Sequence, residues 1–175
     1  MLYISRILIA FVCSSIFYST VFAYDLLLKD TPVSVYFSPK GGGQQAIVDA
    51  IGQAKESVYV QAYSFTSAPI AKALVDATRR GVKVVAILDK SQRKETYTGA
   101  TFLRNEGIPV YIDATHAIAH NKVMVIDGET VATGSFNFTK AAEERNAENL
   151  IIIKDKGLAR LYMENWERHR SHSIQ

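Results

Sequence analysis

Val84–Leu88 is a run of five apolar residues, and it constrains the fold of this 175-residue chain more than any other segment. A strand without polar positions has to be covered on both faces, as the central strands of an α/β sheet are. Further strand signals, in which β-branched and aromatic residues recur between turn residues, lie at 33–37, 57–65, 110–112 and 150–153. We therefore expect a sheet whose inner strands are buried between helices.

Helical spacing of apolar residues separates these strands. The clearest helix lies between Ser67, an expected N-cap, and Gly81, which is expected to end it, and Pro69 suits its first turn. Other helices are expected at 47–55, near 97–105, and along 158–166. The resulting order, β-α-β-α-β-α-β, predicts an α/β fold with a mixed, mainly parallel sheet flanked by helices on both faces.

The first 23 residues have the composition of a secretory signal rather than of a folded segment. Arg6 supplies one positive charge, 7–17 is apolar, and the segment ends in a small residue that signal peptidases favour. An uncleaved membrane anchor is the alternative, but 7–23 is only 17 residues long and contains several Ser and Thr side chains. We therefore expect a protein that is secreted or periplasmic, with a single domain at 24–175.

Cysteine content and charge limit the kinds of site and partner that this protein can have. The only cysteine, Cys13, lies in the expected signal, so the mature chain can form no disulfide and no thiolate metal site. Basic residues exceed acidic ones by 20 to 17, too small an excess to indicate a polyanionic partner. Two basic clusters, 79–83 and 90–94, are each explained by solvated loop charges when considered alone.

The segment from His120 to Thr139 carries the groups that chemistry at a phosphodiester needs. His120 and Lys122 are two residues apart on an expected strand, so both side chains point to the same face. Asp127 has the opposite parity and precedes Gly128, in a dipeptide that favours a hairpin turn. We therefore expect Asp127 to have a structural role, away from His120 and Lys122.

A two-residue hairpin turn would bring four polar side chains onto one patch. It places Ile126 opposite Glu129, Lys122 opposite Thr133 and His120 opposite Ser135, with Asn137 following on the same face. The register is an assumption, and a slip of one residue would scatter the set. Each residue alone also has an ordinary explanation as a turn, strand-end or core residue. Their coincidence on one face predicts a site.

The sequence shows no competing site. It contains no His-Glu-x-x-His, Gly-x-Ser-x-Gly or Walker motif, and no clustered set of Asp, Glu and His for a metal. His169 and His172 lie in the polar C-terminal tail and are expected in solvent, while His116 is a candidate to line the site. We therefore expect neither a metal nor a cofactor.

The motif residues stand in the order His-x-Lys-x4-Asp followed by Gly-Ser-x-Asn, which resembles the signature of the phospholipase D superfamily. They are His120, Lys122, Asp127, Gly134, Ser135 and Asn137. Beyond the motif, the chain resembles the small bacterial endonucleases of that superfamily, which carry a single motif copy, at 61–66, 80–84, 134–142 and 146–149. The resemblance implies a phospholipase D-like α/β sandwich.

The resemblance also implies a mechanism that uses two histidines from two motif copies. One attacks phosphorus to give a phosphohistidine, and the other protonates the leaving oxygen and then activates water. A chain with one copy is therefore expected to form a homodimer whose shared site contains His120 of each subunit. Lys122 and Asn137 are expected to hold the non-bridging oxygens, Ser135 to contact the phosphate, and Glu148 to orient His120. Asp127 and Gly134 are expected to serve the structure.

Three functions remain open from the sequence. The leading one is a secreted, metal-independent phosphodiesterase that cleaves DNA or RNA with little sequence preference, using the basic loops to follow the backbone. The alternative keeps the mechanism and takes a phospholipid headgroup as its substrate. The second alternative is a non-catalytic binding protein on the same fold, against which the intact motif argues.

Overall fold

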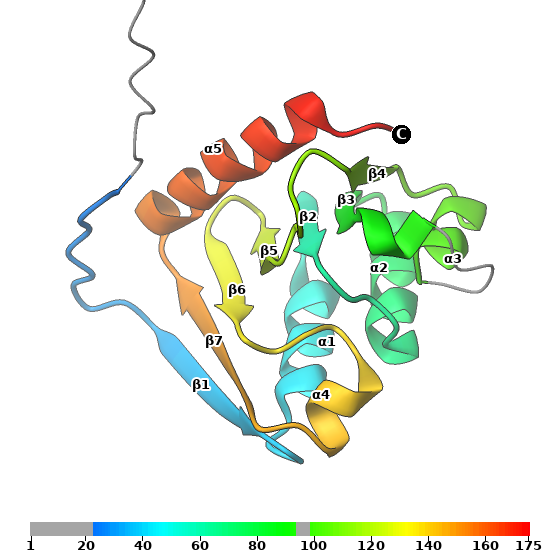
Figure 1. Ribbon diagram of the computed structural model, residues 1–175. Coiled ribbons are helices and arrows are strands. Elements are labelled where there is room, and N and C mark those ends of the chain that lie inside the picture. Colours follow the sequence, from blue (N-terminus) through cyan, green and yellow to red (C-terminus); the bar gives the residue numbers. More distant parts are fainter. Residues whose placement is uncertain (1–22, 94–98) are drawn as a thin grey trace, which may run out of the picture.

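Seven strands form the centre of the computed structural model, which describes residues 23–93 and 99–175 (Figure 1). The strands are β1 (Val33–Ser38), β2 (Ser57–Ala62), β3 (Lys83–Asp89), β4 (Val110–Asp113), β5 (Lys122–Ile126), β6 (Thr130–Gly134) and β7 (Glu148–Lys154). They lie in the order β1-β7-β6-β5-β2-β3-β4. The helices are α1 (Gly43–Gln53), α2 (Ala68–Arg79), α3 (Gly99–Asn105), α4 (Lys140–Glu144) and α5 (Lys156–His172), with a short 3-10 turn, η1 (Lys90–Arg93).

The sheet is mixed, and the predicted α/β class with helices on both faces is confirmed. The expectation that parallel pairs predominate is corrected, because β2–β3 and β3–β4 are parallel while the other four neighbouring pairs are antiparallel. A tight loop joins β5 to β6, and such a connection forces antiparallel pairing. β1 pairs with β7 at the sheet edge, a contact between distant segments that local periodicity does not report.

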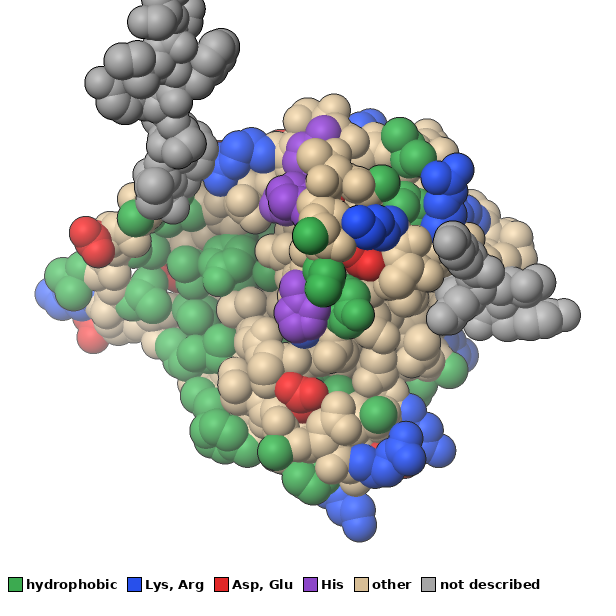
Figure 2. Space-filling model, viewed as in Figure 1, with side chains coloured by type: hydrophobic (Ala, Val, Ile, Leu, Met, Phe, Trp, Pro, Cys, Tyr) green, Lys and Arg blue, Asp and Glu red, His purple; other side chains and the backbone are tan. Residues whose placement is uncertain are grey.

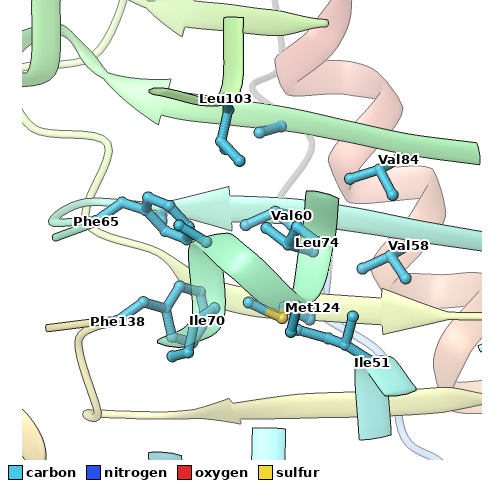
Figure 3. Close-up of a cluster of buried hydrophobic side chains, with 14 of the residues drawn as sticks. Ile51, Val58, Val60, Phe65, Ile70, Leu74, Val84, Leu103, Met124 and Phe138 are labelled. Carbon is cyan, nitrogen blue, oxygen red and sulfur yellow. The ribbon is translucent and has the colours of Figure 1, made fainter. Parts of the chain in front are cut away.

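One core lies between the sheet and helices α1 and α2 (Figure 3). Ile51 of α1 and Leu74 of α2 are completely buried there. They belong to the same cluster as Val58 and Val60 of β2 and Met124 of β5. The apolar stripes of the two helices therefore cover the strands that carry the motif.

Helix α5 covers the opposite face of the sheet (Figure 1). Its Trp166 packs with Val85 and Ile87 of β3, and the indole nitrogen donates to the Val60 carbonyl at 2.9 Å. The alternate residues of β3, such as Ala86, belong to the first core. Both faces of β3 are thus buried, as its apolar run predicts.

The predicted ends of α2 are confirmed. Ser67 Oγ accepts a hydrogen bond from the Ile70 amide at 3.4 Å, and Pro69 lies in the first turn. Gly81 follows the helix with a φ of 90°, a left-handed value that glycine adopts without the steric cost of a Cβ. The helix predicted near 97–105 is described from Gly99 onward.

The expected signal at 1–23 lies outside the described residues, except for its last residue. Within the part of the chain that the structure describes, no helix is both long and apolar enough to cross a membrane. Export and the start of the mature domain stay predictions from the sequence.

The β5–β6 hairpin has a three-residue loop, and its predicted register is wrong by one residue. Ile126 pairs with Thr130 rather than with Glu129. The Glu129 amide donates to the Ile126 carbonyl at 3.1 Å, and Asp127 and Gly128 have φ values of 51° and 63°. The two left-handed residues reverse the chain, as the dipeptide predicts, but a third residue is used before the ladder begins. Every pairing predicted along this hairpin is shifted by the same one residue.

Asp127 joins this hairpin to the start of β2. Its carboxylate accepts the amides of Lys55, Glu56 and Ser57 at 2.8–2.9 Å, and its own amide donates to the Ser57 carbonyl at 2.9 Å. Burial acts to raise the pKa of this carboxyl, but the three N–H donors hold the pKa below its usual value. Asp127 therefore has a structural role, at the end of β5 farthest from Lys122.

Replacing Asp127 with alanine is expected to lower the free energy of unfolding by about 2 kcal/mol at pH 7, since three amides lose a charged acceptor. The folded pKa lies below the unfolded value of about 3.9, so this stabilisation is present above that value and is lost as pH falls through the folded pKa. Urea unfolding of both proteins at pH 7 and at about pH 3 measures the effect. Asp127→Asn keeps one acceptor and tolerates positive φ, so we expect an intermediate loss. A difference of the same size at both pH values would contradict the role of the charge.

Candidate active site

The motif residues meet at one end of the sheet. Lys122 begins β5 and Glu148 begins β7, while Gly134 ends β6 and Ala62 ends β2. Because β5 is antiparallel to both β2 and β6, and β6 to β7, these four strand ends lie together. The loop that carries His120 leads directly into β5 at the same end.

His120 and Lys122 are held by contacts with Tyr63. The exposed His120 ring lies 4.6 Å from the Tyr63 ring, centroid to centroid, at an angle of 51°. Lys122 Nζ lies 5.2 Å from the centroid of the same tyrosine ring and donates to the His120 carbonyl at 2.7 Å. The ammonium is thus fixed next to the imidazole by its hydrogen bond and by a cation–π contact.

Lys122 is a buried cation, with only 6% of its surface exposed. Burial lowers the pKa of its ammonium from the ordinary value, and the nearby charge of Glu148 opposes that shift. A buried cation gains from an anionic ligand, because the ligand restores the electrostatic stabilisation that water no longer provides. The environment of Lys122 therefore suits a phosphate group.

A bulge between β6 and β7 places the next motif residues. The amides of Ser135 and Phe136 both donate to the Asn149 carbonyl at 3.1 Å, and Ser135 Oγ accepts the Asn149 amide at 3.0 Å. A Cβ on Gly134 would lie 2.2 Å from the Asn149 carbonyl oxygen, so a side chain does not fit there. A bulge of this kind interrupts the alternation of side chains and redirects the residues that follow.

Asn137 follows the bulge between two buried aromatic residues, Phe136 and Phe138. Its side-chain oxygen is buried and has no hydrogen-bond partner among the described residues. An unpaired buried polar atom is uncommon in proteins. The NH2 group of the Asn137 side chain is the donor that a phosphate oxygen requires.

Glu148 has its own partners within the chain. Its carboxylate accepts the Asn146 side-chain amide at 3.1 Å, and its backbone amide donates to Ser38 Oγ at 3.1 Å. It acts on Lys122 through its charge. The orientation of His120 by Glu148 stays a prediction.

Asp89 is a positioning residue that the sequence analysis missed. It ends β3 with only 2% of its surface exposed, and its carboxylate accepts the amides of Ser91 and Ala119 at 2.8 Å each. Burial acts to raise its pKa, but these donors hold the pKa below the usual value. Because Ala119 directly precedes His120, Asp89 fixes the loop that presents the imidazole. An acidic residue directly after a buried strand was the available signal.

The four histidines occupy two places on one face of the molecule (Figure 2). His116, His169 and His172 surround Asp113, with ring centroids 4.8–5.4 Å apart. The expectation of solvent exposure is wrong for His169, whose side chain is 14% exposed, whereas His172 is exposed as expected. The expectation of no clustered Asp and His set is corrected by the same geometry. His120 is the one imidazole beside Lys122.

The two basic clusters lie at opposite ends of the sheet. The cluster at 79–83 precedes β3, where Arg79 pairs with Glu106 at 2.9 Å and Arg80 donates to the Ile51 carbonyl at 2.9 Å. The described part of the other cluster is η1, which directly follows β3 at the site end. Only the second cluster is placed to serve the site.

An imidazole, a buried ammonium and an amide at one end of a mixed sheet are groups suited to the hydrolysis of phosphodiester bonds, and the comparisons with known proteins assign the chain to that class of enzyme. The chain belongs to the phospholipase D superfamily, since residues 47–170 match the family described as "Cardiolipin synthase, PLD-like domain". The alternative of a non-catalytic binding protein receives no support from this membership.

Similar proteins agree with this assignment. A crystal structure of a phospholipase D family member, Nuc from Salmonella typhimurium, matches with a TM-score of 0.78 and 38% identity over 83% of this chain and 97% of that one. NucT from Helicobacter pylori matches with a TM-score of 0.77 and 25% identity over 83% of this chain and 99% of that one. A phospholipase D of Rickettsia conorii is 48% identical over 139 residues, 79% of this chain and 70% of the relative.

Asp89→Asn is expected to lower kcat for a simple phosphodiester, bis(p-nitrophenyl) phosphate, by about 10–100-fold with little change in KM, because a misplaced His120 slows chemistry more than binding. Steady-state kinetics measure kcat and KM separately for the variant and the wild type. Circular dichroism checks that both are folded. Asp76→Asn, on the exposed face of α2, is the matched control and is expected to keep wild-type kinetics. Equal losses in both variants, or a loss confined to KM, would contradict the positioning role.

Proposed function

We propose that this chain is a secreted or periplasmic, metal-independent phosphodiesterase that cleaves DNA or RNA with little sequence preference. The proposal is carried by the groups at one end of the sheet: the exposed His120 imidazole, the buried Lys122 ammonium and the Asn137 amide, whose NH2 group can donate. These supply a nucleophile, a phosphate-binding cation and a polar contact.

In the proposed reaction, an imidazole nitrogen of one His120 forms a bond to phosphorus while the bond from phosphorus to the leaving oxygen breaks. The protonated His120 of the second subunit gives its proton to that oxygen. The same histidine then takes a proton from water, whose oxygen attacks phosphorus and breaks the phosphorus–nitrogen bond. Lys122 and Asn137 stabilise the charge that builds on the non-bridging oxygens, and Ser135 contacts the phosphate.

The histidine arrangement supports a shared site in a homodimer. The mechanism needs two imidazoles, and each chain provides one beside Lys122, since the other three histidines surround Asp113. A two-fold axis through the site would bring a second His120 opposite the first.

An open apolar face gives the second copy a place to bind. Val33, Val35 and Phe37 of β1 are 47%, 52% and 68% exposed, on the face opposite to Tyr36, which packs toward α1. Figure 2 shows hydrophobic side chains gathered where Figure 1 places β1 and β7. Exposed apolar patches of this kind mark interfaces. The patch runs along β1 toward its last pairing, Ser38 with Glu148, at the border of the site, so docking here would bring two sites together.

The second basic cluster favours nucleic acid as the substrate. Lys90 and Arg93 of η1 follow β3 at the site end, where they can contact phosphates next to the one that is cleaved. Such contacts read the backbone and not the bases, which agrees with low sequence preference.

A phospholipid is the second candidate substrate, and one observation favours it. Ile118, two residues before His120, is 56% exposed on the loop that carries the histidine. An apolar side chain in this position could contact the acyl region of a lipid surface. The Rickettsia relative named phospholipase D is in keeping with this candidate.

His120→Ala is expected to abolish cleavage of plasmid DNA and RNA, with a loss of at least about 10³-fold, because both chemical steps use this imidazole. Wild-type activity is expected to persist in excess EDTA at 25 °C, with circular dichroism confirming that the chain stays folded. Phosphatidylcholine vesicles are assayed in parallel for choline release. Choline release without nucleic-acid cleavage would move the assignment to the lipid, and loss of activity in a folded, chelated chain would overturn the metal-free reaction.

Subunit mixing tests the shared site. Wild-type and His120→Ala chains are exchanged at different ratios, and activity is measured at a constant total concentration of chains. A site that needs His120 from both subunits gives activity proportional to the square of the wild-type fraction, so an equal mixture keeps about a quarter. A linear dependence, with about half retained, would show that each chain acts alone.

A further inference from the structure

Asp113, His116, His169 and His172 form a compact cluster outside the site that contains His120. One oxygen of Asp113, Oδ2, lies 2.9 Å from His116 Nδ1, 2.7 Å from His169 Nδ1 and 3.3 Å from His172 Nε2. One ligand atom from each residue lies within 4.8 Å of the others. Three imidazole nitrogens therefore converge on one carboxylate oxygen.

The spacing of these atoms matches a tetrahedral metal site. With Zn–N and Zn–O bonds of about 2.0–2.1 Å, the ligand atoms of a tetrahedron lie about 3.3 Å apart. The three nitrogens already lie 2.7–3.3 Å from Asp113 Oδ2. Small rotations of the side chains would separate them enough to admit an ion at the centre.

The backbone presents the four ligands as two pairs with the same spacing. Asp113 and His116 are three residues apart at the end of β4, and His169 and His172 are three residues apart in the last turn of α5. In α5 this spacing places His169 and His172 on one face, while the loop after β4 turns His116 back onto Asp113. The C-terminal end of a helix also carries partial negative charge, which favours a cation. Two pairs from distant segments are a common arrangement in structural zinc sites.

The surroundings hold the ligands in place. The Thr115 amide donates to Asp113 Oδ1 at 3.1 Å, which orients the carboxylate, and Lys90 Nζ donates to the His116 carbonyl at 2.9 Å. Beyond the cluster, Ile174 pairs with Ile112 in an antiparallel bridge. Asp113 is completely buried, whereas the side chains of His116 and His172 are 45% and 33% exposed, which leaves an ion a path from solvent.

We propose that Asp113, His116, His169 and His172 bind a transition-metal dication, with Zn²⁺ as the preferred ion, and that the ion fastens the end of α5 to the end of β4. Three imidazoles and one carboxylate are ligands of borderline softness that suit Zn²⁺ and exclude Mg²⁺ and Ca²⁺, which take oxygen ligands. Four protein ligands leave no open position for a substrate or a water molecule, so the site is structural. It is compatible with metal-free chemistry at His120.

The test uses the wild-type chain without a polyhistidine tag, stripped with EDTA and then dialysed. Titration with Zn²⁺ against a chromophoric chelator is expected to give one ion per chain, while Mg²⁺ is expected not to bind. Co²⁺ in place of Zn²⁺ is expected to give the visible absorption of a four-coordinate site. At a Zn²⁺ concentration about 100 times Kd, the Tm is expected to rise by roughly 5–10 °C.

Matched histidine variants locate the site. His169→Ala and His172→Ala are each expected to lose tight binding and the rise in Tm, whereas His120→Ala, which removes a histidine outside the cluster, is expected to keep both. Failure of the folded wild type to bind Zn²⁺, binding unchanged in His169→Ala and His172→Ala, or binding without a rise in Tm would each overturn the proposal. These measurements do not involve phosphodiester cleavage, so they stand or fall independently of the proposed function.

Discussion

The antiparallel pairing of β5 with β2 is the contact on which the rest of the structure depends. It joins a parallel half, β2-β3-β4, to an antiparallel half, β5-β6-β7-β1. Asp127 secures this pairing by holding three amides at the start of β2, and the five-residue strand β5 then carries Lys122 to the other end, about 17 Å away. Asp127 therefore does not contact the site. It fixes how β5 pairs with β2, and that pairing sets the position of Lys122.

Buried charged side chains lie at the end of the sheet that carries the site, whereas the core of the molecule is apolar. Asp89, Asp113 and Lys122 are all almost fully buried, and each lies at a strand end on this side. Burying such groups costs free energy unless hydrogen bonds or opposite charges offset it. Backbone amides offset it for Asp89 and three imidazoles for Asp113, while Lys122 has a carbonyl, an aromatic ring and the charge of Glu148. Of these three buried charges, Lys122 is therefore the one that a bound anion would stabilise.

The histidine side chains lie in two neighbouring groups. Around Asp113, three imidazoles and a carboxylate join α5 to β4, and next to Tyr63 a single exposed imidazole faces solvent. The loop from β4 to β5 connects the two, since it runs from Asp113 through His116 to His120. A structural ion at the first place would restrain one end of this loop, while Asp89 restrains the other end at Ala119. Each chain therefore has one imidazole beside Lys122, while its other three histidines surround Asp113.

The sequence by itself determined the α/β class, the buried strand at 84–88, the ends of α2 and the motif that defines the superfamily, because these depend on local periodicity, caps and spacing. It also indicated a structural turn at Asp127. Only the tertiary structure decided that most strand pairs are antiparallel and that the hairpin register differs by one residue. It alone revealed Asp89 behind His120 and the cluster around Asp113. Those features rest on contacts between segments as distant as Asp113 and His169, and the pattern of residues within a segment carries no record of which distant segment it will meet.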